Sequence, residues 1–197
     1  MDVATVVKNA GSHFLLSCLP EWRPFPAILR GKVRLEKSGS TNPVAVGDIV
    51  RFLASDEVSE QNPAIITEVL PRKNYLIRKS TNLSRQSHVI AANLDQAIIV
   101  ASLYFPELKM PFLDRILVTC EVYGIPAVIA LNKVDLYREA AFEQFRSFVD
   151  IYTKAGYRVI PTSARTREGV DELRQLCHDK VSLFSGESGV GKSSLVK

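Results

Sequence analysis

The hydrophobic positions of the first 72 residues come in short runs, too brief for helices of ordinary length. Gly, Asn, Pro and Ser cluster between the runs, as they do in turns. Five runs rich in β-branched or apolar residues occupy positions 3–7, 14–18, 28–35, 48–53 and 64–70. Five such strands over residues 1–72 are typical of a small closed sheet, either an OB-like or an SH3-like barrel. The N-terminal part is therefore predicted to be an all-β barrel.

From residue 86 onward the pattern changes to continuous apolar runs separated by stretches with helical spacing. The runs occupy positions 97–101, 127–131, 158–161 and 181–185. Apolar residues recur at helical spacing after Pro111, before Gly156 and over 170–177. Because strands of a parallel sheet are buried on both faces, this alternation predicts an α/β domain with a parallel sheet covered by helices.

The excess of positive charge lies in the N-terminal part of the chain. Residues 1–85 contain 12 Lys and Arg against 8 Asp and Glu, a balance of +4, whereas residues 86–197 contain 13 of each. Basic side chains alternate along the run 28–35 and gather again around Tyr75, so both stretches are candidates for contact with nucleic acid. The candidate RNA-binding residues are Arg30, Lys32, Arg34, Arg72, Lys73, Arg78 and Lys79. For the first three, the alternative is the solvated side of a strand.

The sequence contains no segment that indicates export or membrane insertion. Its N-terminus lacks a basic stretch followed by an apolar core, and no run approaches ~18 uninterrupted apolar residues. We therefore expect a cytoplasmic monomer without membrane contact. Cys18, Cys120 and Cys177 are too far apart for a zinc motif or a disulfide framework. Trp22 lies in a proline-rich loop, where it could stack on a nucleobase or pin the loop to the barrel.

The clearest chemical signal lies near the end of the sequence, directly after the run 181–185. The segment Gly186-Glu187-Ser188-Gly189-Val190-Gly191-Lys192-Ser193, followed by Ser194, matches the pattern G-x-x-x-x-G-K-S. A strand, a glycine-rich turn and a helix start form a cradle whose backbone N–H groups face phosphate oxygens. Lys192 would reach the β- and γ-phosphates, and Ser193 would offer its hydroxyl to Mg²⁺. The alternative is an ordinary Gly/Ser turn, which needs neither the strand before it nor the helix after it.

Two further polar segments follow apolar runs, which is where parallel sheets bind ligands. The segments are Asn132-Lys133-Val134-Asp135, after the run 127–131, and Thr162-Ser163-Ala164, after the run 158–161. Together with the phosphate cradle they resemble the nucleotide-contact motifs of the GTP-binding protein superfamily, in which N-K-x-D reads guanine. By itself, N-K-x-D could also be a polar loop at a helix start.

The chemistry of these side chains fits that resemblance. Asp135 can accept hydrogen bonds from the ring N–H and the exocyclic amine of guanine, two donors that adenine does not present together. Asn132 can tie the base-binding loop to the phosphate cradle, and Lys133 can lay its aliphatic stem along the base. The backbone amide of Ala164 can meet the guanine carbonyl.

The order of the motifs is unusual, because the base-reading segments precede the phosphate cradle. A barrel over 1–72, a basic linker at 73–85 and a GTPase domain over 86–197 in permuted order closely resemble the bacterial ribosome small-subunit-dependent GTPase A family. The resemblance covers essentially the whole chain. It implies an N-terminal OB-fold, a circularly permuted P-loop GTPase domain, and GTP or GDP bound with Mg²⁺. It also implies that the protein hydrolyses GTP during late maturation of the small (30S) ribosomal subunit, with that subunit and its rRNA as partners.

The sequence departs from that family in where it stops. By Lys197 neither the switch threonine, the D-x-x-G segment nor the family's C-terminal zinc domain has been reached, so no residue is assigned as catalytic. We expect a truncated GTPase domain with little or no turnover, and the run 181–185 as an uncovered apolar sheet edge. Two other functions stay open: an ATP-using nucleic-acid-binding P-loop protein, and a catalytically inactive RNA-binding fragment.

Overall fold

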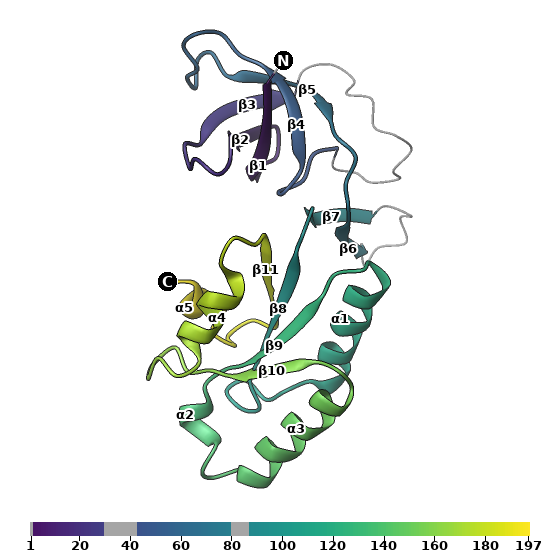
Figure 1. The fold of residues 1–197 in the computed structure, drawn as a ribbon, viewed down its shortest axis with the longest axis vertical. Helices are drawn as coiled ribbons and strands as arrows, with labels where there is room; N and C mark the ends of the chain where they lie inside the picture. Colours follow the sequence, from purple (N-terminus) through teal and green to yellow (C-terminus); the bar gives the residue numbers. More distant parts are fainter. Residues whose placement is uncertain (1, 30–42, 80–86) are drawn as a thin grey trace. The chain divides into compact units, whose positions relative to one another are not determined.

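The chain forms two compact units, Met1–Asn93 and Leu94–Lys197 (Figure 1). A computed structural model describes residues 2–29, 43–79 and 87–197. Each unit has its own sheet and its own hydrophobic core, so each is described by itself. The boundary lies between residues 93 and 94, whereas the sequence placed it between 85 and 86.

The first unit contains the predicted five-stranded barrel. Its strands are β1 (Asp2–Ala10), β2 (His13–Ser17), β3 (Phe25–Leu29), β4 (Ile49–Leu53) and β5 (Ala64–Val69). They close in the order β1-β2-β3-β5-β4, and β3 and β5 run parallel while the other barrel pairs are antiparallel. This order, with a crossover between β3 and β5, is that of an OB-like barrel and confirms the all-β prediction. The predicted strand at 28–35 starts earlier, at Phe25, and its part beyond Leu29 lies outside the described residues.

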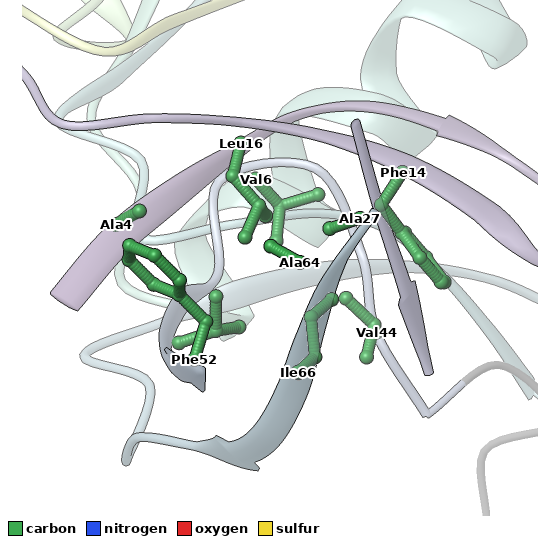
Figure 2. Packing of buried hydrophobic residues seen from close by; sticks show 10 residues of the cluster. Ala4, Val6, Phe14, Leu16, Ala27, Val44, Phe52, Ala64 and Ile66 are labelled. Atoms are coloured by element: carbon green, nitrogen blue, oxygen red, sulfur yellow. The ribbon is translucent and has the colours of Figure 1, made fainter. Parts of the chain in front are cut away.

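The barrel core follows from the alternation of side chains along each strand. Val6, Leu16 and Ile66 point inward and are at most 1% exposed, and the residues on either side of Val6 and Ile66 are more exposed (Figure 2). Phe25 and Phe52 add a tilted ring contact with centroids 5.2 Å apart. The apolar residues in the runs therefore fill one closed interior.

A two-stranded sheet has its first strand in the predicted linker, 73–85, and its second at the start of the predicted GTPase domain, 86–197. Its strands are β6 (Tyr75–Lys79) and β7 (Ser87–Ala92), paired antiparallel. Leu76 and Val89, one from each strand, are buried. A bridge between Val46 and Ala91 joins this sheet to the segment before β4. Residues 87–93 therefore belong with the barrel, which explains the shifted boundary.

The second unit is a four-stranded parallel sheet covered on both faces, as the apolar runs predicted. The strands are β8 (Gln96–Ala101), β9 (Ala127–Leu131), β10 (Arg158–Pro161) and β11 (Ser182–Ser185), in the order β10-β9-β8-β11. The helices are α1 (Met110–Val122), α2 (Val134–Tyr137), α3 (Phe142–Lys154), α4 (Val170–Cys177) and α5 (Lys192–Val196). All six residues of β8 are buried, and β11 lies at the edge of the described sheet.

The helices divide between the two faces of this sheet (Figure 1). Val170 and Leu173 of α4 and Leu195 of α5 pack in one cluster with sheet residues such as Ile98 and Ile160. On the other face α1 packs on β8 and β9, and α3 packs on β10. The Tyr152 hydroxyl on α3 donates to Asp114 Oδ1 on α1 at 2.8 Å, which joins these two helices. This framework holds the carboxyl ends of the strands in fixed positions.

Candidate functional site

Three loops meet at the carboxyl edge of the parallel sheet. They follow β9, β10 and β11, and they contain the residues that the sequence singled out. Asn132 N donates to Ala101 O at the end of β8, and Thr162 N donates to Leu131 O at the end of β9. The hydrogen bonding of the sheet therefore continues for one bond past β9 and past β10, and these bonds fix the first residue of each of the two loops.

The phosphate loop, residues 186–191 after β11, is the cradle predicted from the sequence, and its backbone takes conformations that favour glycine. Gly186, Gly189 and Gly191 have φ angles of +149°, +81° and +96°, which other residues rarely adopt. A Cβ on Gly186 would lie 2.2 Å from the carbonyl oxygen of Val100, so the loop passes directly over the end of β8. Val190 is buried beneath the loop, whereas Ser188, Ser193 and Ser194 are exposed. One side of the loop therefore packs on the sheet through Val190, and its other side is exposed to solvent.

Lys192 and Ser193 open helix α5 at the end of this loop. The Lys192 ammonium donates to two loop carbonyls, Gly186 O at 2.9 Å and Glu187 O at 2.6 Å. It is therefore already directed into the ring of the loop, where it can reach an anion. The Ser193 hydroxyl lies in the first turn of α5, one residue after Lys192.

Asn132 connects the loop after β9 to the phosphate loop. Its side-chain amide donates to Val190 O at 2.8 Å, and its side-chain oxygen accepts from the Thr162 hydroxyl at 3.3 Å. The residue is 1% exposed, so both bonds are shielded from water. One buried side chain therefore ties all three loops together.

Lys133 makes a second link between the same two loops. Its backbone is left-handed, with φ +64° at the N-cap of α2. Its ammonium donates to Gly189 O at 2.7 Å and to the carbonyl oxygen of Phe105, in the loop after β8. The aliphatic stem of Lys133 therefore runs from the loop after β9 to the phosphate loop.

Asp135 is held in place by the loop after β10. Its Oδ1 accepts from the Ser163 hydroxyl at 2.6 Å, and that hydroxyl in turn accepts from Thr166 N at 3.1 Å. Arg165 lies 3.9 Å from its Oδ2, with the Arg165 side chain 81% exposed and the carboxylate side chain 12% exposed. Val134 N donates to Thr162 O at 3.2 Å. This bond joins the loops after β9 and β10, which are called the base-side loops below. Ala164 is partly buried and packs against the core cluster.

Three residues around these loops were not singled out from the sequence. They are Phe105 and Lys109, after β8, and Tyr137, close to Asn132. The Tyr137 hydroxyl donates to Asn132 O at 2.8 Å, and burial raises the pKa of Tyr137 to about 12, so it stays a donor at neutral pH. The available signal was position: residues directly after β8 lie at the same edge of the sheet as the other loops.

The candidate RNA-binding residues have a different outcome. Arg30, Lys32 and Arg34 lie outside the described residues, and Arg78 and Lys79 lie in β6. Lys73 is exposed. Arg72 instead forms a two-pronged ion pair with Asp48, whose side chain is fully buried, at 2.6 and 2.7 Å. The guanidinium of Arg72 is therefore held by the barrel, and its own contact with RNA stays an untested prediction.

Other features of the described residues bear on the expectations from the sequence. Trp22 is 68% exposed, so it does not pin its loop to the barrel. Within ranges 2–29, 43–79 and 87–197, no three His, Cys, Asp or Glu side chains gather as a metal site would require. No helix in those ranges is long and apolar enough to cross a membrane.

A parallel sheet with a glycine-rich phosphate loop and two base-side loops at one edge defines a P-loop nucleotide-binding domain. The chain belongs to the RsgA GTPase family, which matches residues 69–197. It is 43% identical over 191 residues to the small ribosomal subunit biogenesis GTPase RsgA of Bacteroides fragilis, covering 97% of this chain and 60% of that protein. For the protein of the same name from Flavobacterium johnsoniae, the identity is 44% over 193 residues, covering 98% and 58%.

Two solved structures share this fold. YjeQ from Thermotoga maritima is 32% identical with a TM-score of 0.76, covering 98% of this chain and 63% of that one. YloQ, described as a circularly permuted GTPase, is 28% identical with a TM-score of 0.67, covering 98% and 62%. The chain thus spans about 60% of the length of the relatives that it matches.

Proposed function

We propose that this chain binds GTP at the three loops and belongs to a protein that hydrolyses GTP to GDP and phosphate. The observation that carries the proposal is the buried side chain of Asn132, which bonds Val190 O in the phosphate loop and Thr162 in the base-side loop. A site that coupled phosphate and base recognition would need such a link. The names of the relatives from Bacteroides fragilis and Flavobacterium johnsoniae extend the proposal to small ribosomal subunit biogenesis.

Each loop would take one part of the nucleotide. The amides of residues 186–191 and the Lys192 ammonium would hold the phosphates, and the Ser193 hydroxyl would offer a ligand to Mg²⁺. Mg²⁺ would neutralise charge that develops on the phosphates during hydrolysis. Lys133 would lie along the base. The fit rests on the inward position of Lys192, 2.6 Å from Glu187 O, and on the side of the loop that is exposed to solvent.

Asp135 would select guanine over adenine. Ser163 occupies one position on Oδ1, and a carboxylate has about four lone-pair sites, so acceptor positions remain for two guanine donors. Charge-assisted bonds contribute about 1.5–3 kcal/mol each, so losing both favours GTP over ATP by roughly 10²–10⁴. With adenine the carboxylate would be desolvated without these partners.

The test is competitive binding of GTP, ATP and XTP to the unaltered chain and to Asp135→Asn. The amide would place a donor where guanine also has one, so the substitution should remove most of the preference for GTP. It should improve the binding of XTP, whose base presents a carbonyl at that position. If Asp135→Asn keeps GTP ahead of XTP, Asp135 does not read the base and the guanine assignment fails.

The ribosomal part of the proposal concerns the first unit. Residues 1–93 carry the whole net charge of +4, since 86–93 contain no Lys, Arg, Asp or Glu. A basic OB-like barrel suits contact with rRNA phosphates. We therefore assign partner binding to this unit and nucleotide binding to residues 94–197.

A further inference from the structure

The phosphate loop contains an acidic residue at a position where a polyanion would bind. Glu187 directly follows Gly186, and its side chain is only 18% exposed. A carboxylate beside the phosphates of a nucleotide repels them, because like charges at short range are unfavourable. The loop therefore has a local conflict with its proposed ligand, and conflicts of this kind occur at functional positions.

A lysine outside the loop compensates this carboxylate. Lys109 Nζ lies 3.3 Å from Glu187 Oε1, and the Lys109 side chain is 76% exposed. Lys109 is the N-cap residue of α1 and lies far from Glu187 in the sequence. No motif predicts this contact. It exists because the segment between β8 and α1 lies against the phosphate loop.

Two further contacts show how closely that segment lies. The carbonyl oxygen of Phe105 accepts a hydrogen bond from Lys133, which also bonds Gly189 O. Pro106 Cδ lies 3.6 Å from the position that a Cβ on Gly189 would occupy. Lys192 Nζ, 2.6 Å from Glu187 O, bonds the backbone of that residue and not its carboxylate. The ion pair at the carboxylate is therefore the one with Lys109.

We infer that Lys109 and Glu187 form a charge pair that sets how strongly the phosphate loop binds tri- and diphosphates. Lys109 is a positioning residue, acting through the carboxylate of Glu187. The repulsion from an unpaired Glu187 grows with the charge of the ligand, and GTP carries about one more negative charge than GDP. Loss of Lys109 therefore penalises GTP more than GDP. The inference rests on the proposed function, since it deepens phosphate recognition at the same site.

The two single substitutions should have opposite effects. Lys109→Gln exposes the ligand to the full charge of Glu187. It should weaken the binding of GTP about five- to tenfold and the binding of GDP about two- to threefold. Glu187→Gln removes the repulsion and leaves Lys109 as an added cation, so it should strengthen GTP binding by up to about fivefold. In Lys109→Gln with Glu187→Gln, GTP affinity should return close to the unaltered value. A pair that merely braced α1 against the loop would show weaker binding in both single variants and no recovery.

The measurement is calorimetric titration of the full chain with GTP, GDP and inorganic tripolyphosphate. The Lys109→Gln effect should shrink between about 0.05 M and about 0.5 M salt, because an electrostatic penalty is screened. Arg158→Gln is the matched control: its pair with Glu172, at 2.8 Å, joins β10 to α4 away from the loops. It should change none of these affinities.

Tripolyphosphate separates this inference from the guanine assignment, because it has no base. If it shows the opposing effects while the chain does not prefer GTP over ATP, the guanine assignment fails and the charge pair stands. If GTP is preferred but Glu187→Gln weakens every ligand, or Lys109→Gln affects GTP and GDP equally, the charge pair is wrong. If the unaltered chain binds neither nucleotide nor tripolyphosphate, both are wrong.

Discussion

At the scale of single residues, the phosphate loop has no room for a side chain where its last glycine lies. A Cβ on Gly191 would be 2.4 Å from Asn132 Nδ2, far inside van der Waals contact. Asn132 cannot simply move aside, because that nitrogen donates to Val190 O and the residue is buried. The glycine and the asparagine therefore depend on each other, although they lie on different loops.

Gly191→Ala should consequently lower GTP affinity by about tenfold or more, equivalent to at least about 1.4 kcal/mol. The added methyl group would displace Asn132 and break the link between base and phosphate recognition. Gly156→Ala is the control, because its φ of +93° is nearly the same and its Cβ would meet nothing within 4 Å. Equilibrium binding of GTP to both variants tests this. Equal losses of affinity would mean that backbone strain, and not Asn132, is responsible.

The motif residues of the site could be predicted because their chemistry is local in sequence. Asn132, Asp135 and Ser163 each follow an apolar run, and the structure brings them together at one sheet edge. Lys109 and Tyr137 could not be predicted in the same way. Their contacts with Glu187 and Asn132 exist only because of how the loop after β8 and helix α2 pack.

At the scale of elements, the barrel is fastened to the β6–β7 sheet through one tight turn before β4. Gly47 has φ +90°, and its N–H donates to Val6 O at 2.8 Å. A Cβ there would lie 2.1 Å from the carbonyl oxygen of Ala92, which is backbone and cannot rotate away. Asn93 adds a bond from its side-chain nitrogen to Gly47 O at 2.9 Å. The close approach of these two segments requires glycine.

Gly47→Ala should therefore destabilise residues 1–93 by more than about 4 kcal/mol, a loss seen only where a specific packing feature is broken. Gly11→Ala is the matched control: φ is +76° but nothing lies within 4 Å of its Cβ. It should cost only the left-handed backbone penalty of about 1–2 kcal/mol. Denaturant unfolding followed by hydrogen exchange of barrel amides, such as the Val6 N–H that donates to Asp48 O, measures both. Similar losses in the two variants would show that the contact with Ala92 is unimportant.

Elements marked by a continuous apolar run or by helical spacing of apolar residues were predicted well. The strand β6, whose sequence lacks such a pattern, was not. The run 127–131 is β9 with the same bounds, and helix α1 begins one residue before Pro111. The sequence of β6, with Lys and Arg at its end, looks like a charged linker, and only its pairing with β7 makes it a strand. The short helix α2 was missed because four residues give too little periodicity.

At the scale of the whole molecule, charge is divided between the two units. Residues 1–93 have a balance of +4, from 12 basic and 8 acidic residues, and residues 94–197 have 13 of each. Part of the basic group is already used inside the fold, because Arg72 neutralises the buried Asp48. The sequence also predicts contact with rRNA for Lys73, Arg78 and Lys79, and that prediction can be tested apart from Arg72.

Replacing Lys73, Arg78 and Lys79 together by Gln should weaken binding to purified small ribosomal subunits. It should also flatten the dependence of log affinity on log salt by about 0.7–0.9 for each rRNA phosphate that is no longer neutralised. Binding would be measured from about 50 to about 200 mM salt, the range over which phosphate contacts change affinity most clearly.

Arg72→Gln separates RNA contact from structural support. Leaving Asp48 buried without its partner should cost about 3–5 kcal/mol of stability, because a buried charge loses its compensation. In the fraction that stays folded, the salt dependence should equal that of the unaltered chain, because the Arg72 guanidinium is already bound to Asp48 and Pro43 O. An unchanged slope in the triple variant would remove these three residues as phosphate contacts. A flatter slope in folded Arg72→Gln would show instead that Arg72 leaves Asp48 to bind rRNA.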